Sequence, residues 1–532
     1  MTLFLITLFL PLVGSLLTLF INKENTKLIK NLALSFSLVT FVLSMFVFFT
    51  FDQNETGFQF YLNQTWIPQI DAGFRVGVDG ISILLFVLTT FLSPITILSS
   101  FSAIHKREKE YYIMILLLEF AMLGVFVSLD LFLFYIFWEL ILIPMYFIIG
   151  IWGGKDRIYA TVKFFIFTVV GSLLMLVAIV WLGNFVGSYL AAAGKLASGF
   201  TTNFALIRET LQTVNLPMDV QNWIFLAFAL SFAIKVPLFP LHTWLPDAHT
   251  EAPTPGSVIL AGVLLKMGTY GLIRFNVELF PQSAMHYSSI ISVLAVIGII
   301  YGAIVAMIQT DVKKLVAYSS VSHLGFVVLG IFSLTAAGIQ GALIQMVNHG
   351  LSTGMLFLCV GIIYERRHTR EIAEFGGLAK VMPIYTVFFA IAMLASVGLP
   401  GLNGFVGEYL TLVGAFTSPV LHNWGYTIFA ASGVIFAAVY LLWMFQRVMF
   451  GQITNPNNLG LKDVNAKEVW TLVPLVIFIV WIGVYPNTFM KYSEKGTRAV
   501  VNRAYEKNGM PKPFYMPEIE IKKEIKSENI SK

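Results

Sequence analysis

Six ionisable side chains lie inside apolar stretches of the chain. A charge near the centre of a bilayer costs roughly 2.5 to 3.5 kcal/mol on insertion scales, so each one needs a partner, a water-filled cavity or a function. Amines, imidazoles and carboxylates in series can accept and release protons. Six such groups in different stretches predict a buried proton path in preference to six independent packing features. They are Glu139, Lys235, Lys266, His323, His349 and Glu408.

Each residue taken alone has a simpler interpretation. Lys235 is equally compatible with a lysine whose amine snorkels to the membrane interface. A single buried histidine is more often a hydrogen-bonded packing residue than a relay. The two histidines, however, lie on polar helix faces that cannot be turned toward lipid. One face carries Ser319, Ser322 and His323, and the other carries Gln345, Asn348, His349 and Ser352.

These polar faces serve either as helix contacts, at about 0.6 kcal/mol for each hydrogen bond, or as the lining of a hydrated path. We favour the path, with His323 as a relay and His349 as a second candidate for the same role. Haem ligation by these two histidines has no other support in the sequence. A cluster without any recognised zinc spacing is interpreted as loop capping, so no metal site is expected. It contains His242, Asp247, His249 and Glu251.

Redox and nucleotide chemistry are excluded from this chain by what it lacks. Cys359 is its single cysteine, so neither an iron–sulfur cluster on four thiolates nor a c-type haem can be built here. No Gly-rich phosphate loop and no dinucleotide fingerprint is present. The formal charge of +5 lies mostly in loops and a tail, so it does not indicate a nucleic-acid partner.

The composition identifies the elements that must position these side chains. Of the 532 residues, 57% are hydrophobic and only 12% are charged, which predicts an all-α polytopic membrane protein in a lipid bilayer. Apolar runs predict about fourteen spans. The first run has no basic residues before it and no cleavage site, so we expect a retained helix. The spans begin near residues 1, 28, 79, 110, 130, 159, 220, 254, 286, 311, 338, 382, 424 and 468.

Basic residues predict how the spans are oriented. Lys and Arg concentrate in the loops after odd-numbered spans, and such loops stay in the cytoplasm during insertion. Both termini are therefore expected to face away from it. The basic C-terminal tail would favour a cytoplasmic C-terminus, but this tail also carries acidic residues and lies far from the last span. From about Asn502 this tail is expected to be disordered or to pack on a partner.

Two spans are expected to be broken. Lys235 is followed by Pro237 and Pro240, and the sequence Gly-Leu-Pro-Gly at 398–401 precedes Glu408. Proline removes a backbone donor and clashes with the preceding turn. Two broken spans five apart, each beside an ionisable residue, predict two inverted five-helix repeats, although simple proline kinks remain the alternative. The repeats would be 110–280 (helices 4–8) and 281–450 (helices 9–13), between N-terminal helices 1–3 in 1–109 and helix 14 with a charged tail in 451–532.

The chain resembles the antiporter-like membrane subunits of respiratory complex I, which are related to subunits of multisubunit cation/proton antiporters. The Trp138-Glu139 helix, the Lys266 helix, Tyr318 to His323 and the Gly-Leu-Pro-Gly break carry the resemblance. Its most specific part is the run from Lys235 to His249, KVPLFPLHTWLPDAH. In the family, the second broken helix carries Glu in one of the three large subunits and Lys in the other two. Glu408 makes this chain similar to the first.

The resemblance implies fourteen helices and no cofactor in this subunit. It implies NADH, FMN, iron–sulfur clusters and quinone in partner subunits, and other membrane-arm subunits as neighbours, including the two other antiporter-like ones. Chain length and loops favour a bacterial inner (plasma) membrane, where the chain would be a multi-pass protein. Glu119 is a departure, because no family role is attached to a carboxylate at that point, so we leave it outside the path.

The residues suggest one order of proton transfer. Lysine has a reference pKa near 10.4, so a lysine that releases protons at neutral pH must have its charged form destabilised, which burial does. We expect Glu139 and Lys235 to form the input pair, with Glu139 controlling the charge on Lys235 by moving toward or away from it. Lys266 would receive the proton, His323 and waters would pass it on, and Glu408 would deliver it outward.

Three other functions use the same residues differently. A Na⁺/H⁺ antiporter subunit would keep the lysines without a redox partner, and Glu408 in place of Lys counts against it. A hydrogenase-linked or ferredoxin-linked membrane complex would keep the relay and change the electron donor. A structural scaffold would tolerate neutralisation of the buried charges without loss of transport.

Overall fold

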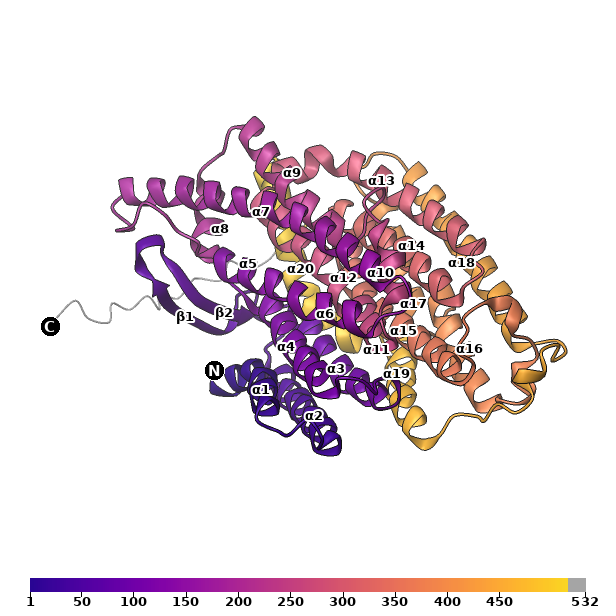
Figure 1. The fold of residues 1–532 in the computed structure, drawn as a ribbon. Helices are drawn as coiled ribbons and strands as arrows, with labels where there is room; N and C mark the ends of the chain where they lie inside the picture. Colours follow the sequence, from indigo (N-terminus) through magenta and orange to yellow (C-terminus); the bar gives the residue numbers. More distant parts are fainter. Residues whose placement is uncertain (515–532) are drawn as a thin grey trace.

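The chain folds into a bundle of helices that run side by side (Figure 1). The fold is taken from a computed structural model, which describes residues 1–514. Twelve of the described helices are long and apolar enough to cross a membrane. They are α1 (Thr2–Leu19), α2 (Thr26–Thr50), α3 (Ile83–Ala103), α4 (Glu108–Val127), α5 with α6 (Leu131–Leu140 and Leu142–Trp152), α7 (Arg157–Ala192), the span from Thr254 to Val277, α13 (Pro281–Met307), α14 (Val312–Phe332), α15 (Ala336–Arg367), α18 (Gly425–Met449) and α19 (Ala466–Val484).

Burial separates inner helices from outer ones. The span Thr254–Val277 and α15 are completely buried over their most apolar stretch, whereas α2 and α19 bury about a third of theirs or less. Outer helices expose Val, Ile, Leu and Phe, as a lipid-facing surface requires. Five of the six polar side chains of interest are buried, and Glu139 is half-buried. This confirms the expectation of a helical, multi-pass membrane protein.

Two helices are interrupted at the predicted places. The helix α9 (Met218–Lys235) ends at Lys235, and α10 (Trp244–Glu251) begins after a prolyl segment. The helix α16 (Pro383–Val397) stops at Gly398, which adopts a φ of +83°, and α17 (Asn403–Phe416) follows. Neither interrupted element belongs to the twelve long apolar helices. The count of fourteen spans and the division into repeats remain predictions.

One inner span has an irregular backbone that the sequence did not reveal. Between Thr254 and Val277, two π-helical segments enclose a short α-helix that carries Lys266. Segments of this kind often occur at functional sites. In order, the span consists of α11 (Thr254–Ile259), η2 (Leu260–Leu264), α12 (Leu265–Gly271) and η3 (Leu272–Val277).

A β-hairpin between α2 and α3 is an addition to the helical fold that we had not expected. The strands β1 (Gln59–Ile67) and β2 (Ala72–Val78) are antiparallel, and α3 begins at Ile83, a few residues after the expected start near 79. Arg75 on β2 is buried and forms ion pairs with Asp71 at 2.5 Å and with Asp130 at 2.6 Å. Because Asp130 also caps α5, this cluster fixes the hairpin to the start of that helix.

The last described helix, α20 (Asn487–Lys507), packs against α3, α13 and α15. The stretch near Asn502 is therefore helical as far as Lys507, and Asn502 exchanges hydrogen bonds with Phe514 beyond the helix. The rest of the predicted tail, 515–532, lies outside the described residues. Short elements complete the fold. They are η1 (Pro68–Ile70), α8 (Phe204–Thr213), η4 (Ile372–Glu374), η5 (Leu378–Lys380) and η6 (Pro456–Asn458).

Candidate functional site

Lys266 lies at the centre of the bundle with no exposure to solvent. Its Nζ donates to the carbonyl oxygen of Ala261, in the π segment η2, and lies 2.7 Å from Nδ1 of His349 on α15. An amine and an imidazole at this distance share one proton along the contact, and the tautomer of the ring decides which group donates. The side chain of Lys266 is thus directed from its own span to α15.

Two histidines continue this contact toward α17. The rings of His349 and His323 lie with their centroids 5.9 Å apart, and Nδ1 of His323 lies 2.7 Å from Oε1 of Glu408. Both rings leave Nε2 without a hydrogen-bond partner among the described residues. Four of the six sequence-predicted residues, drawn from four helices, therefore form one buried row. His349, the second candidate, lies between Lys266 and His323.

Side-chain amides hold α15 against the start of α17. Gln345 donates to Oε1 of Glu408 at 3.2 Å. Asn348 donates to the carbonyl oxygen of Asn403 at 2.7 Å, and Asn403 donates back to that of Asn348 at 3.2 Å. Asn403 is the first residue of α17, so this pair of hydrogen bonds fixes α15 to the N-terminal end of that helix. Asn403 was visible in the sequence only as part of the break, so its contact with α15 was missed.

Close backbone approach brings Gln345 to the carboxylate. A Cβ on Gly407 would lie 2.3 Å from the side-chain oxygen of Gln345, so only glycine leaves room for this amide beside α17. Gly407 immediately precedes Glu408 and follows the predicted helix break at 398–401.

Glu139 and Lys235 are not in contact. Lys235 is 1% exposed, and its Nζ has no hydrogen-bond partner among the described residues. It lies 5.1 Å from the ring centre of Trp138 and 5.7 Å from that of Phe164, where aromatic faces attract a cation. Glu139 is half-buried on α5, and its Oε1 is also without a partner. The expected input pair therefore stands apart in this structure.

No hydrogen bond among residues 1–514 links Lys235 to Lys266. The helices α9 and α12, which carry these two lysines, are nevertheless in contact. A Cβ on Gly268 of α12 would lie 2.7 Å from the carbonyl oxygen of Phe232 on α9. The structure thus shows a row from Lys266 to Glu408, with hydrogen-bond contacts at its two ends and neighbouring histidine rings between them, and a separate lysine at the helix break.

Four residues were expected to cluster in a loop, but Asp247, His249 and Glu251 lie in α10 and only His242 precedes this helix. Their side chains contact different neighbours. Asp247 forms an ion pair with Lys163 at 2.7 Å, and Glu251 accepts from the amide of Asp156 at 2.9 Å. His242 stacks on Phe239, and His249 stacks on Phe357 with centroids 4.7 Å apart. Within the described part of the chain, no group of three or more His, Cys, Asp or Glu side chains is arranged to hold a metal ion.

Glu119 is buried away from this row. It is 1% exposed on α4, and neither carboxyl oxygen has a hydrogen-bond partner among residues 1–514. Because α4 packs on α1, α2 and α3, this acid belongs to the N-terminal part of the bundle, and the structure does not connect it to the candidate path.

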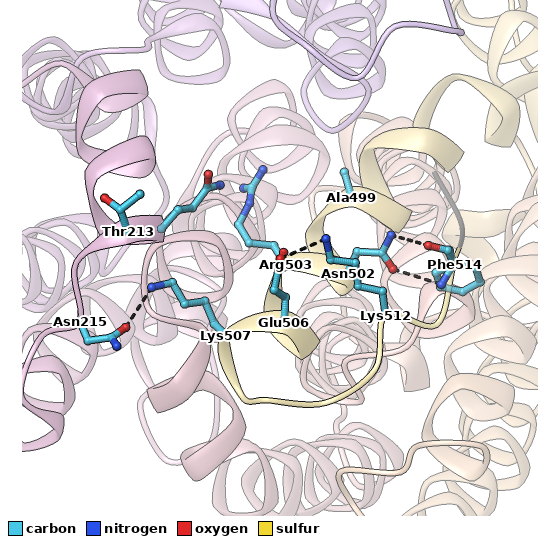
Figure 2. A pocket seen from close by; sticks show the side chains of 10 residues that line it. Thr213, Asn215, Ala499, Asn502, Arg503, Glu506, Lys507, Lys512 and Phe514 are labelled. Atoms are coloured by element: carbon cyan, nitrogen blue, oxygen red, sulfur yellow. Dashed lines mark hydrogen bonds and ion pairs between the residues drawn. The ribbon is translucent and has the colours of Figure 1, made fainter. Parts of the chain in front are cut away.

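A cavity of about 1080 Å³ lies at the surface between α20 and the end of α8 (Figure 2). Lys507 donates to Asn215 across it at 3.0 Å, and Asn502 exchanges two hydrogen bonds with Phe514. None of the six buried residues lines this cavity, so it is separate from the candidate path.

Comparison with known proteins places this geometry in a family context. The profile of the family described as NADH:quinone oxidoreductase/Mrp antiporter, TM, matches residues 128–436. The chain is 47% identical to NADH-quinone oxidoreductase subunit M of Rhodobacter capsulatus, over 86% of this chain and 87% of that one. It is 42% identical to NADH-ubiquinone oxidoreductase chain 4 of Marchantia polymorpha, over 91% and 93% of the two chains.

Solved structures with the same fold come from three membrane complexes. A chain of respiratory complex I from Thermus thermophilus superposes with a TM-score of 0.82 at 32% identity, covering 94% of this chain and 99% of that one. A chain of an archaeal membrane-bound sulfane sulfur reductase gives 0.78 at 24% identity, covering 90% and 76%. A chain of the Mrp complex from Dietzia gives 0.76 at 20% identity, covering 93% and 52%. The last two likenesses concern the fold alone.

Proposed function

The chain belongs to the family of NADH:quinone oxidoreductase and Mrp antiporter membrane subunits, and from this membership we propose which of its residues carry protons. It is a proton-translocating, multi-pass subunit of the membrane arm of NADH-quinone oxidoreductase, like the subunit M proteins to which it is similar, and it lies in a bacterial-type inner membrane. Its enzymatic role is that of a subunit of this oxidoreductase complex, and the redox chemistry takes place elsewhere in the complex.

The row from Lys266 to Glu408 is the observation that supports the proposed path. Each member can both accept and release a proton, and the polar contacts at the two ends of the row measure 2.7 Å. Within residues 1–514, the Nε2 atoms of His349 and His323 have no hydrogen-bond partner. A proton taken by His349 at Nδ1 leaves from Nε2, passes through neighbouring water to Nε2 of His323 and leaves from Nδ1 to Glu408. Each ring thereby exchanges tautomers.

Glu139 and Lys235 act as the control element of this path. Lys235 forms no ion pair with Glu139, and its amine lies against the aromatic rings of Trp138 and Phe164. Approach of the carboxylate would stabilise the ammonium, and withdrawal would release a proton from it. The driving energy comes from quinone reduction in other subunits, which hold the NADH, FMN, iron–sulfur and quinone sites. The neighbours in the membrane arm include the two other antiporter-like subunits.

The two segments 110–280 and 281–450 are proposed as inverted repeats. Each contains one interrupted helix, α9 with α10 in the first and α16 with α17 in the second. In this arrangement the control element belongs to the first repeat. The row begins at Lys266 in the first and ends at Glu408 in the second.

Replacement of the control residues tests the proposal. Glu139→Gln and Lys235→Met should leave the complex assembled and abolish coupled proton pumping, because neither side chain can then change its charge. Pumping is measured as protons moved per NADH oxidised, with the whole complex in proteoliposomes. Lys163→Met serves as a control, since Lys163 pairs with Asp247 near the loop side. A normal proton-to-electron ratio in either test variant would contradict the proposal.

A further inference from the structure

A small polar cavity lies where α6 and α10 meet the start of α14. Its volume is about 120 Å³, which holds several waters, since one water needs roughly 10 to 15 Å³ of such space. It borders loops that follow odd-numbered spans, the side where Lys and Arg concentrate. That side is expected to be cytoplasmic. The polar wall includes Gly153, Gly154, Glu251, Thr254, Lys313 and Arg370.

Lys313 is the buried amine of this wall. It is 5% exposed, and its Nζ donates to the carbonyl oxygens of Ala252 at 2.5 Å and Thr250 at 3.5 Å. The carboxylates nearby are engaged elsewhere, with Asp311 paired to Arg370 at 3.0 Å and Glu251 bound to a backbone amide. Carbonyl oxygens accept from an amine in either protonation state, so Lys313 can gain or lose a proton without leaving its place.

His249 lies on the inner side of Lys313. It is not exposed to solvent, its ring stacks on Phe357, and both ring nitrogens lack hydrogen-bond partners among the described residues. Its backbone is held by the hydroxyl of Ser257, which donates to its carbonyl oxygen. Thr250, the next residue along α10, accepts from Nζ of Lys313 at 3.5 Å, so Lys313 lies beside the backbone that carries this ring. A buried polar atom without a partner costs about 1 to 3 kcal/mol, so a ring with two such atoms points to a transfer role.

We propose that this cavity takes up protons and that Lys313 and His249 deliver them to Lys266. A water in the cavity protonates neutral Lys313. The ammonium then gives a proton through an intervening water to the bare nitrogen of His249. The opposite nitrogen of the ring releases its own proton through a second water to neutral Lys266, and Lys266 passes it to His349. One proton moves at each step and none is consumed. The inference rests on the proposed function and adds an uptake route that does not pass through Lys235. In this scheme Lys235 acts only as part of the control element with Glu139.

The decisive variants change the ability of Lys313 to release a proton. Lys313→Met removes the amine, and Lys313→Arg keeps the charge and the donors to the two carbonyls but cannot be deprotonated. Proton pumping by the complete NADH-quinone oxidoreductase in proteoliposomes should fall on the order of 10²-fold in both. Lys314→Met is the matched control, because this neighbour is more exposed and lines no part of the cavity. Full pumping by Lys313→Arg would reduce Lys313 to a structural cap and overturn the inference.

A second variant tests the inner step. His249→Phe preserves the flat packing on Phe357 and removes both ring nitrogens, and the same loss of pumping is expected. Lys266→Met is measured beside it. If Lys266→Met loses pumping while Lys313→Met and His249→Phe pump normally, the uptake route is wrong and the proposed function stands. If Lys266→Met also pumps normally, the proposed function itself fails.

Discussion

Nδ1 of His323 lies 2.7 Å from Oε1 of Glu408, joining α14 to α17 one turn after the helix break. Gln345 donates to the same carboxylate oxygen at 3.2 Å. The carboxyl group thus has a titratable partner on one side and a non-titratable amide on the other. Proton exchange with the row therefore has to pass through His323.

Neutralising Glu408 should stop transfer while the contact is kept. Glu408→Gln can still hydrogen-bond to His323, yet it cannot take up and release a proton. Pumping should drop on the order of 10²-fold, the scale at which a positioned acid or base acts. Proton movement per NADH in proteoliposomes is the measurement, and Glu408→Asp should retain part of the activity. Undiminished pumping by Glu408→Gln would exclude this carboxylate from the path.

The close approach at Gly407 should be sensitive to one methyl group. Gly407→Ala places a Cβ against Gln345, so the amide must move away from Glu408. We expect a loss of about 1 to 3 kcal/mol of stability from overpacking, seen as a lower melting temperature of the purified complex. Gly460→Ala is the control, because a Cβ there meets nothing within 4 Å. Equal melting temperatures for the two variants would contradict the tight contact.

The ion pair between Asp79 and Arg274 should persist in mild acid and weaken only below about pH 4. Burial alone would raise the pKa of Asp79, but the ion pair with Arg274 at 2.6 Å and hydrogen bonds from the amides of Ser82 and Ile81 bring this pKa below its ordinary value. The stabilisation is therefore complete above the unfolded-state pKa of about 3.9 and disappears as the pH falls through the lower folded-state value.

Thermal melting of wild type and Asp79→Asn at several pH values tests the direction of this pKa shift. Their difference in melting temperature should stay constant from neutral pH down to about pH 5 and shrink below about pH 4. Asp219→Asn provides the control, since Asp219 is exposed. A difference that already shrinks near neutral pH would mean that the folded-state pKa is raised.

Arg75 should hold the hairpin in place. Arg75→Met leaves Asp71 and Asp130 without their cation, and breaking a buried pair costs about 3 to 5 kcal/mol. Amide hydrogen exchange in β1 and β2 should rise in the purified complex. Arg498→Met removes a more exposed pair with Glu494, worth at most about 1 kcal/mol, and should leave this exchange unchanged. Equal protection in both variants would show that the hairpin is held by other contacts.

The sequence identified the residues of the row better than their order. Lys266, His323, His349 and Glu408 stood out because polar groups are costly in apolar helices, and the breaks after Lys235 and before Asn403 followed from proline and glycine. The central place of His349 depends on how α12, α14 and α15 cross. Periodicity within one helix carries no information about such a crossing.

Other features stayed hidden for related reasons. The hairpin at 59–78 is short and irregular in register, so its pattern was not recognised beside long apolar runs. The position of the Lys235 amine over the rings of Trp138 and Phe164 depends on how α5, α7 and α9 pack together, which the sequence does not show. The pairing of Asn348 with Asn403 depends on how closely α15 approaches the start of α17, which the pattern of either helix alone does not show.

The π segments on both sides of Lys266 make the length of this span critical. Each π turn holds one residue more than an α turn, and one residue corresponds to roughly 100° of rotation about a helix axis. Deleting a single residue from η2 would allow the segment to tighten into regular α-helix and would turn the side chain of Lys266 away from α15. Single-residue deletions in this span should therefore be tolerated less well than conservative substitutions of its apolar residues.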